Sequence, residues 1–202
     1  MKSYYDKTAE AYDERWHEYN KQTITNINKT LDQNGIEYES LIDYGCGTGE
    51  VLYSLLSSNS KLKVYGVDPS EQMREKAREK LQGFQSVEIL SLEQIKTLPE
   101  VDLVLTTNAL HHFKQPVEVL TTLIGLAKSN GSIYVSDYSK QSIAPKYFEW
   151  LIKILDSSHV RAYTLDEAVT MVKKISNTEI ILAQETNLGR WWQGYELLIK
   201  KL

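Results

Sequence analysis

The stretch Leu41-Ile42-Asp43-Tyr44-Gly45-Cys46-Gly47-Thr48-Gly49 decides the fold class of this 202-residue chain. Its first four residues read as a short strand, and apolar residues at helical spacing follow it over 51–56. The glycines between them form a turn that brings backbone close to a ligand, because glycine tolerates positive φ and has no side chain. The pattern indicates strand, glycine turn and helix.

The same unit recurs along the chain. The apolar run at 101–106 is typical of a strand buried on both faces, and Pro116 opens the helix that follows it. Residues 179–183 and 195–199 read as strands with no helix between them, which predicts an antiparallel closing pair. The remaining predicted strands cover 62–67, 87–90 and 132–137.

Helical patterns alternate with these strands. Two pairs of residues have the spacing of a capping box at a helix N-terminus: Ser91 with Gln94, and Thr164 with Glu167. The predicted helices are two within 1–34, one entered at Ser70 and running to 81, a brief one from 91, one at 116–127 that stops at Asn130-Gly131, and those at 147–155 and 165–175. Together these elements predict a doubly wound α/β fold with a mostly parallel, seven-stranded sheet. Its ligand crevice lies beyond the carboxyl ends of the strands.

Composition limits the function. A net charge of −4 argues against nucleic-acid binding, which needs clustered Lys and Arg, and favours a small-molecule substrate. No segment approaches the roughly 18 apolar residues of a membrane span, and residues 1–4 lead into a charged segment, so we expect no membrane insertion and a cytoplasmic location. The single cysteine, Cys46, predicts neither an internal disulfide nor a metal site.

The glycine turn has a specific ligand preference. Its G-x-G-x-G spacing differs from the G-x-G-x-x-G of dinucleotide-binding turns, and Asp43 would repel a pyrophosphate but accept hydrogen bonds from an ammonium group. Asp68 ends the second strand, about 20 residues beyond the turn, where a carboxylate can bind ribose hydroxyls. The alternative for Asp68-Pro69-Ser70 is a plain helix entry. The two sites together predict a nucleoside joined to an amino acid.

These residues resemble a known family. Residues 41–50 resemble motif I of the class I S-adenosylmethionine-dependent methyltransferases, and residues 64–73 are similar to motif II. Residues 101–112 resemble motif IV of the small ubiquinone/menaquinone-biosynthesis-like branch (methyltransferase type 11/25). The resemblance implies one Rossmann-like methyltransferase domain, with an N-terminal helical lid (1–37), a cofactor-binding core (38–137) and substrate-side helices with closing strands (138–202).

The resemblance also implies roles for individual residues toward S-adenosylmethionine. An acidic residue that relatives carry after the third strand, against the adenine amino group, is replaced here by Ser91 and Leu92. The implied contacts are Asp43, Gly45, Cys46 and Gly47 with the methionine part, Asp68 with the ribose, Pro69, Met73, Ser91 and Leu92 with the adenine, Asn108 near the methionine end, and Tyr5 and Tyr12 as lid residues.

Candidates for catalysis follow the fourth and fifth strands. The candidates that lie where substrate and cofactor would meet are His111, His112, Asp137 and Tyr138. Each of them is either a general base or a structural part of its loop. Arg161 either pairs a substrate carboxylate or makes a surface ion pair. Aromatic residues that would cover the crevice, or simply pack, include Trp16, Tyr147, Trp150, Trp191 and Trp192.

The sequence therefore predicts a methyltransferase that acts on a small-molecule acceptor by in-line transfer. Oxygen, nitrogen and carbon acceptors all remain open. The alternative is a non-catalytic S-adenosylmethionine-binding subunit of a heteromeric methyltransferase, and a nicotinamide oxidoreductase is disfavoured by the glycine spacing. A monomer and a homodimer are both compatible with the sequence.

Overall fold

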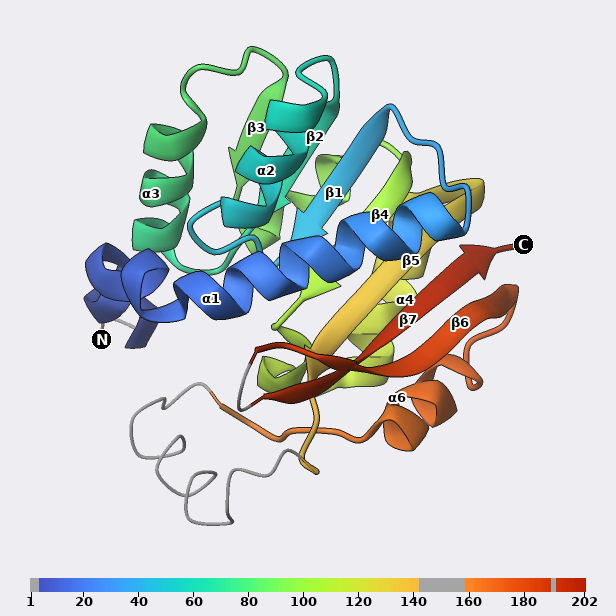
Figure 1. Cartoon of the computed structure of the whole chain (residues 1–202). Coiled ribbons are helices and arrows are strands. Elements are labelled where there is room, and N and C mark those ends of the chain that lie inside the picture. The colour runs from blue at the N-terminus through green and yellow to red at the C-terminus, as the bar shows by residue number, and fades with distance from the viewer. Residues whose placement is uncertain (1–3, 142–158, 190–191) are drawn as a thin grey trace.

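A seven-stranded sheet forms the centre of the molecule. The computed structural model describes residues 4–141, 159–189 and 192–202, with side chains from residue 12 onward. The strand order is β3-β2-β1-β4-β5-β7-β6 (Figure 1), and β7 runs antiparallel to both of its neighbours, which confirms the predicted sheet. The strands are β1 (Ser40–Tyr44), β2 (Lys63–Val67), β3 (Val87–Leu90), β4 (Val101–Thr107), β5 (Ala127–Tyr138), β6 (Thr178–Asn187) and β7 (Gln193–Lys201).

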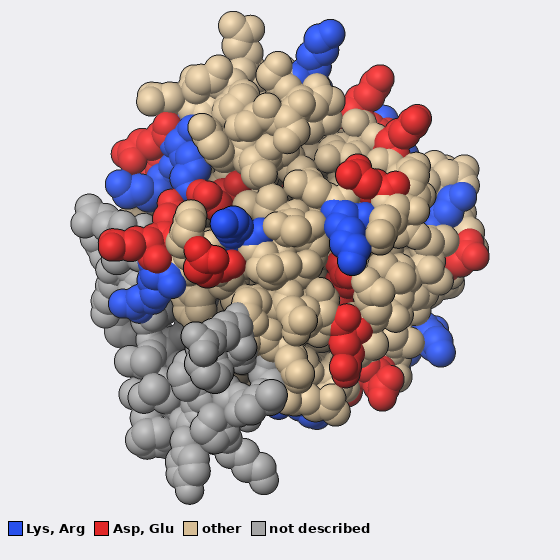
Figure 2. All heavy atoms as spheres, in the orientation of Figure 1, with Lys and Arg blue, Asp and Glu red and all other residues tan. Residues whose placement is uncertain are grey.

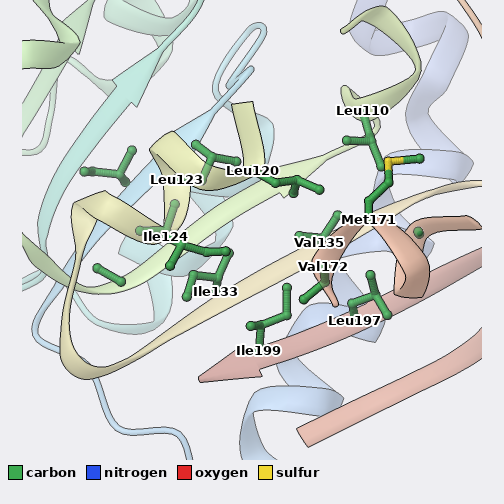
Figure 3. Packing of buried hydrophobic residues seen from close by; sticks show 14 of the residues in the cluster. Leu110, Leu120, Leu123, Ile124, Ile133, Val135, Met171, Val172, Leu197 and Ile199 are labelled. Carbon is green, nitrogen blue, oxygen red and sulfur yellow. The ribbon is translucent and has the colours of Figure 1, made fainter. Parts of the chain in front are cut away.

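Helices cover both faces of the sheet. Leu41 of β1 packs in a cluster with residues of α1, α2 and α3, whereas its neighbour Ile42 packs in a cluster with residues of α4 and α6. Successive strand residues point to opposite faces, so each apolar strand serves two cores. Figure 3 shows the second core. The helices are α1 (Tyr4–Gln33), α2 (Glu50–Ser58), α3 (Glu71–Leu81), α4 (Pro116–Leu126) and α6 (Leu165–Val172), with short 3-10 helices η1 (Leu92–Thr97) and η2 (Leu110–His112).

The two helices expected within 1–34 are both present, joined end to end as α1 across a kink at the non-helical Trp16 (φ −107°, ψ 15°). The predicted boundary between the fourth helix and the fifth strand is wrong. Helix α4 ends at Leu126, because Ala127 is extended and pairs with Val101 at the start of β5. The pair Asn130-Gly131 lies inside β5 as an irregularity, with Asn130 at φ 64°. The predicted helix at 147–155 falls outside the described residues.

The C-terminal part of α1 is held on the sheet by buried polar contacts. Asn26 donates to the Asn187 carbonyl at 2.9 Å. Glu196 is buried on β7. One of its carboxylate oxygens accepts hydrogen bonds from the Thr30 hydroxyl at 2.9 Å and from the Tyr134 hydroxyl at 2.6 Å. Buried hydrogen bonds to a charged group are strong and directional, so they fix where α1 crosses the sheet. Figure 1 shows this crossing in front of β1, β4 and β5.

The surface that α1 crosses carries both signs of charge. Figure 2 shows acidic and basic side chains interspersed there, without an extended area of either sign. This face therefore lacks the concentrated positive charge that nucleic-acid binding needs. Among the described residues, no helix combines the length and apolar character needed to cross a membrane.

The tight approach of β7 to β5 generates a stability prediction. A Cβ at Gly194 would meet the Leu188 side chain and would lie 2.7 Å from the Asp137 carbonyl oxygen. We expect Gly194→Ala to lower the free energy of unfolding by about 1–3 kcal/mol through overpacking. Gly125→Ala is the control, because a Cβ there meets nothing within 4 Å and alanine favours the helix. Urea unfolding of both variants tests this, and equal stabilities would contradict it.

Candidate functional site

The glycine turn closes over the carboxyl ends of β1 and β2. Gly45, Gly47 and Gly49 all have left-handed backbone, with φ of 86°, 54° and 80°. A Cβ at Gly45 would lie 2.8 Å from Cβ of Ala109, so this glycine allows the loop after β4 to pack against the turn. A Cβ at Gly47 would meet nothing within 4 Å, which leaves that side of the turn open to a ligand.

The end of β2 supports the turn. The Gly45 and Cys46 amides donate to the Val67 carbonyl at 2.7 and 3.1 Å. The two carboxylate oxygens of Asp68 accept from the Gly47 amide at 2.9 Å and from the Ser70 amide at 2.8 Å. These two bonds hold the Asp68 carboxylate at the carboxyl end of β2, the position where a carboxylate can bind the hydroxyls of a ribose.

Arg74 fixes the backbone of Asp68. Its Nη1 donates to the Asp68 carbonyl at 2.6 Å, and its Nη2 pairs with Glu71. Arg74 is only 7% exposed, which is unusual for an arginine. Sequence reasoning missed this residue, because an arginine in a charged helix normally faces solvent.

Asp43 is a buried acidic group of the site that is not fully satisfied. It is buried at the carboxyl end of β1, and its Oδ1 has no hydrogen-bond partner among the described residues. Burial, and secondarily the charge of Asp68, raise the pKa of Asp43 to about 7. A buried carboxylate without a cation is costly, and a ligand ammonium group would satisfy it. The site therefore fits an amino-acid cation beside the glycine turn.

The residues expected near the adenine differ in exposure. Pro69 is exposed, whereas Met73 is buried at 2% exposure. The Ser91 amide donates to Gln94 Oε1 at 3.0 Å, which confirms the predicted capping box, and Leu92 packs partly buried on the core. Cys46 is buried, and burial raises the pKa of its thiol well above the ordinary value, so it is held as an unreactive thiol.

Asn108 links the end of β4 to α1. Its φ of 54° lies in the left-handed region that asparagine tolerates, and its amide donates to the Ser136 carbonyl at 2.8 Å. The Tyr19 hydroxyl donates to Asn108 Oδ1 at 2.8 Å, and Asn108 Nδ2 donates to Thr23 at 3.3 Å. Asn108 thus lies at the carboxyl edge as predicted, and its side chain helps to position α1.

His111 and Asp137 form a buried pair at the same edge. His111 Nδ1 lies 2.8 and 2.9 Å from the two carboxylate oxygens of Asp137. The same carboxylate accepts from the amides of His111 at 2.9 Å and Tyr138 at 2.8 Å. Two backbone N–H groups thus donate to this carboxylate, and the His111 tautomer with its proton on Nδ1 would add a third donor and leave Nε2 without a proton.

A chain of rings extends from His111 toward α1. The Tyr138 ring lies 4.7 Å from the His111 ring and 5.6 Å from the Trp192 ring. Trp192 in turn lies 6.0 Å from Trp16 and 5.9 Å from Tyr19. The four Tyr and Trp side chains are half-buried. They bring together α1, the end of β5 and the start of β7, which sequence spacing alone does not place in contact.

Two further histidines adjoin this chain. The His112 ring lies 3.8 Å from the His111 ring. His159, which the sequence analysis did not single out, is buried, and its Nδ1 lies 2.9 Å from the Tyr138 hydroxyl. The amides of residues 160 and 161 both donate to the His111 carbonyl at 3.0 Å. The segment that starts at residue 159 therefore packs directly on η2.

The N-terminal part of α1 contacts the glycine turn through a polar cluster. The Thr48 hydroxyl donates to Asp13, and Lys80 of α3 lies 2.7 Å from the same carboxylate. Lys80 also pairs with Glu50. Tyr12 is half-buried, with its ring 6.5 Å from Trp16. The side chain of Tyr5 lies outside the described residues.

Arg161 makes a surface ion pair. Its guanidinium pairs with Glu167 and lies 5.2 Å from the Tyr163 ring centre. Its side chain is 54% exposed. Glu167 also accepts from the Thr164 amide at 2.9 Å in the predicted capping box. These contacts favour the surface role of Arg161 over the binding of a substrate carboxylate.

The hollows at the opposite edge of the sheet are not lined by the residues of this candidate site. One is lined by residues at the amino ends of β1, β2 and β4, among them Asp102 and Lys128. Lys128 Nζ lies 2.7 Å from Asp102, and the Ser40 hydroxyl donates to the same carboxylate at 2.7 Å. These hydrogen bonds hold the pKa of Asp102 well below its usual range, although partial burial opposes them. We assign a structural role, and no role in ligand binding, to this cluster of Asp102, Lys128 and Ser40.

The raised pKa of Asp43 generates a pH-dependent stability prediction. The folded state holds the Asp43 proton up to about pH 7, whereas the unfolded chain releases it near 3.8. The folded state therefore loses stability as pH rises through this interval. We expect Asp43→Asn to gain on the order of 4 kcal/mol relative to the wild type between about pH 4 and pH 8. Urea unfolding across pH measures it.

Asp32→Asn, at an exposed position, controls for the loss of one negative charge. A stability difference between Asp43→Asn and the wild type that stays constant with pH would contradict the assignment.

Comparison with known proteins places this site in a family. The residue pattern of a methyltransferase domain matches residues 42–145. An uncharacterized methyltransferase of Geobacillus kaustophilus is 31% identical over 136 residues, or 66% of this chain and 61% of that protein. An uncharacterized methyltransferase of Schizosaccharomyces pombe is 26% identical over 181 residues, or 82% of this chain and 62% of that protein. The chain thus spans about three fifths of the length of these relatives.

Solved structures share the fold. A magnesium protoporphyrin IX methyltransferase of Synechocystis with bound S-adenosylhomocysteine has a TM-score of 0.71 at 17% identity, over 91% of this chain and 84% of that one. The plantazolicin methyltransferase BamL has a TM-score of 0.72 at 18% identity, over 96% and 90%. The match of the domain pattern covers half of the residues, including the glycine turn, Asp68 and the His111–Asp137 pair. The chain belongs to the methyltransferase domain family.

Proposed function

We propose that this chain transfers a methyl group from S-adenosylmethionine to a small-molecule acceptor. The observation that carries the proposal is the buried carboxylate of Asp43, whose Oδ1 lacks a partner among the described residues, beside the open Gly47 and the Asp68 carboxylate. One ligand could place an amino-acid ammonium at Asp43, which would satisfy its Oδ1, and a ribose at Asp68.

The proposed contacts follow from the positions of these groups. Asp43 binds the ammonium, the backbone at Gly45, Cys46 and Gly47 lies along the methionine part, and Asp68 binds the ribose hydroxyls. The adenine lies toward Pro69, Met73, Ser91 and Leu92. The cofactor supplies a methyl group that already carries a good leaving group, so the chain's own contribution is to hold the acceptor in line with it.

A small acceptor is supported by charge and by the structural relatives. The net charge of −4 and the mixed surface of Figure 2 disfavour nucleic acid. The names of the Synechocystis enzyme and of BamL refer to a porphyrin and to plantazolicin. The buried His111–Asp137 pair favours a catalytic chain over a subunit that only binds the cofactor, because binding alone needs no such pair.

Binding of the cofactor product tests the proposal directly. We expect S-adenosylhomocysteine to bind with micromolar affinity and NADH not to bind, because Asp43 would oppose a pyrophosphate. Asp68→Ala should weaken S-adenosylhomocysteine binding by at least tenfold, since a hydrogen bond to a charged group contributes about 1.5–3 kcal/mol. Isothermal titration calorimetry measures both. Asp166→Ala, at a surface position of α6, is the control, and the absence of S-adenosylhomocysteine binding would refute the proposed function.

We also propose that the part of α1 before Trp16 is a lid over the cofactor. The helix kinks at Trp16, and Asn26 and Thr30 anchor the part that follows. The part before the kink contacts the glycine turn through Asp13 with Thr48 and Lys80. Opening at the kink would break these contacts and leave the anchored part in place.

The lid predicts salt-dependent release. We expect Asp13→Asn to speed dissociation of S-adenosylhomocysteine by roughly two- to fivefold, the effect of one partly exposed ion pair, and to reduce the salt dependence of that rate. Stopped-flow tryptophan fluorescence measures it. Glu79→Gln is the matched control, because it removes the Lys76–Glu79 pair on the outer surface of the same helix, α3. Equal rates in both variants would contradict the lid.

A further inference from the structure

We propose that Arg74 is a positioning residue for the cofactor, and that it sets the preference of this chain for a ribose over a 2′-deoxyribose. It acts through Asp68, whose backbone it holds, and does not itself contact the ribose. This inference rests on the proposed function, in which Asp68 binds the ribose hydroxyls. The observation that carries it is a buried guanidinium tied to the ends of two neighbouring strands.

Burial distinguishes Arg74 from the other basic residues. No other Lys or Arg is buried among the described side chains. Its Nε is buried as well, and has no hydrogen-bond partner among those residues. A buried charge with an unpaired donor costs stability, and an apolar residue of similar size is often as stable in its place. Residues that break the rules of folding in this way are concentrated at functional sites.

Arg74 acts on the carboxyl end of β2. Its Nη1 donates to the Asp68 carbonyl at 2.6 Å. The Asp68 carboxylate accepts from the Gly47 amide at 2.9 Å on one oxygen and from the Ser70 amide at 2.8 Å on the other. The carbonyl and the carboxylate of one residue are thus both held by donors. Without the guanidinium the backbone of Asp68 is free to rotate, and its carboxylate moves with it.

The guanidinium also links β2 to β3 through α3. Arg74 Nη2 pairs with one carboxylate oxygen of Glu71, and the other oxygen lies 3.3 Å from Arg78 Nη1. Arg78 Nη2 donates to the Ile89 carbonyl on β3 at 3.1 Å. A chain of charged groups therefore runs along α3 between the two strands. It also fixes Arg74, because a guanidinium bound through two of its nitrogens is held against Asp68.

Ribose selectivity depends on where the Asp68 carboxylate lies. Hydrogen bonds weaken steeply with misalignment, so a binding group must be held within about 0.5 Å of its productive position. A displaced carboxylate loses its bonds to the ribose hydroxyls, whereas the contact of Asp43 with the amino-acid part of the cofactor is retained. Loss of Arg74 therefore acts on recognition of the ribose and not on every part of the ligand.

Two ligands that differ by one hydroxyl test this inference. Isothermal titration calorimetry compares S-adenosylhomocysteine with its 2′-deoxy analogue. We expect the wild type to bind S-adenosylhomocysteine at least about tenfold more tightly, the effect of one hydrogen bond to a charged group. Arg74→Leu should reduce this ratio to about threefold or less. Asp68→Ala should abolish the preference, because it removes the carboxylate that contacts the hydroxyl.

Matched variants separate position from charge. Lys76→Leu removes one positive charge from the same helix, at the surface pair of Lys76 with Glu79, and should leave the ratio unchanged. Arg74→Lys keeps the buried charge but lacks the planar fork that reaches both Asp68 and Glu71, so it should also lower the ratio. It replaces the leucine variant if that variant does not fold, which circular dichroism detects.

The outcomes distinguish this inference from the proposed function. A folded Arg74 variant that keeps the wild-type ratio overturns the inference, even where both affinities fall, because a merely structural role lowers the two together. Equal binding of both ligands by the wild type, or loss of the ratio in Lys76→Leu, also overturns it. S-adenosylhomocysteine still binds to the wild type in these cases, so the proposed function is unaffected. A wild type that binds neither ligand refutes the proposed function, and this inference with it.

Discussion

The hydrogen bond from the Gly47 amide to the Asp68 carboxylate is the contact on which the site depends. It joins the turn after β1 to the end of β2, and the Val67 carbonyl adds two further bonds to the same turn. A turn held at both strands keeps its left-handed glycines in place, so Gly47 presents an open backbone. The buried carboxylate of Asp43 then lies beside a fixed wall, which is the condition for selecting a ligand by its charge.

The elements of the fold were predictable because their signals are local. The glycine turn, the strand periods and the two capping boxes each lie within a few residues, and the structure has all of them. Ala127 was predicted wrongly because its apolar period continues that of α4, whereas pairing with Val101 decides its conformation. Local propensity is a weak guide where a neighbouring strand competes. The sequence likewise has no glycine or proline near Trp16 that would predict the kink there.

The site was predictable only in part, for a related reason. Asp43, Asp68 and His111 follow strands, so the topology alone brings them to one edge. Arg74, Asp13 and His159 act through partners such as the Asp68 carbonyl, Lys80 and Tyr138, and each looks like an ordinary surface residue in the sequence. A buried arginine can be recognised only after the fold shows which carbonyl it holds.

The carboxylates at this edge differ in what they can contribute to a methyl transfer. Asp43 and Asp68 favour a cationic ligand, but the positive charge of a sulfonium disappears as its methyl group leaves. Carboxylates that stabilise this charge therefore contribute to binding, and they oppose rather than assist the chemical step. Asp137 differs, because it pairs with His111, and a His111 that accepted a proton under the proposed function would gain positive charge beside it. Under that proposal, rate enhancement depends on the positioning of the acceptor and on the His111–Asp137 pair.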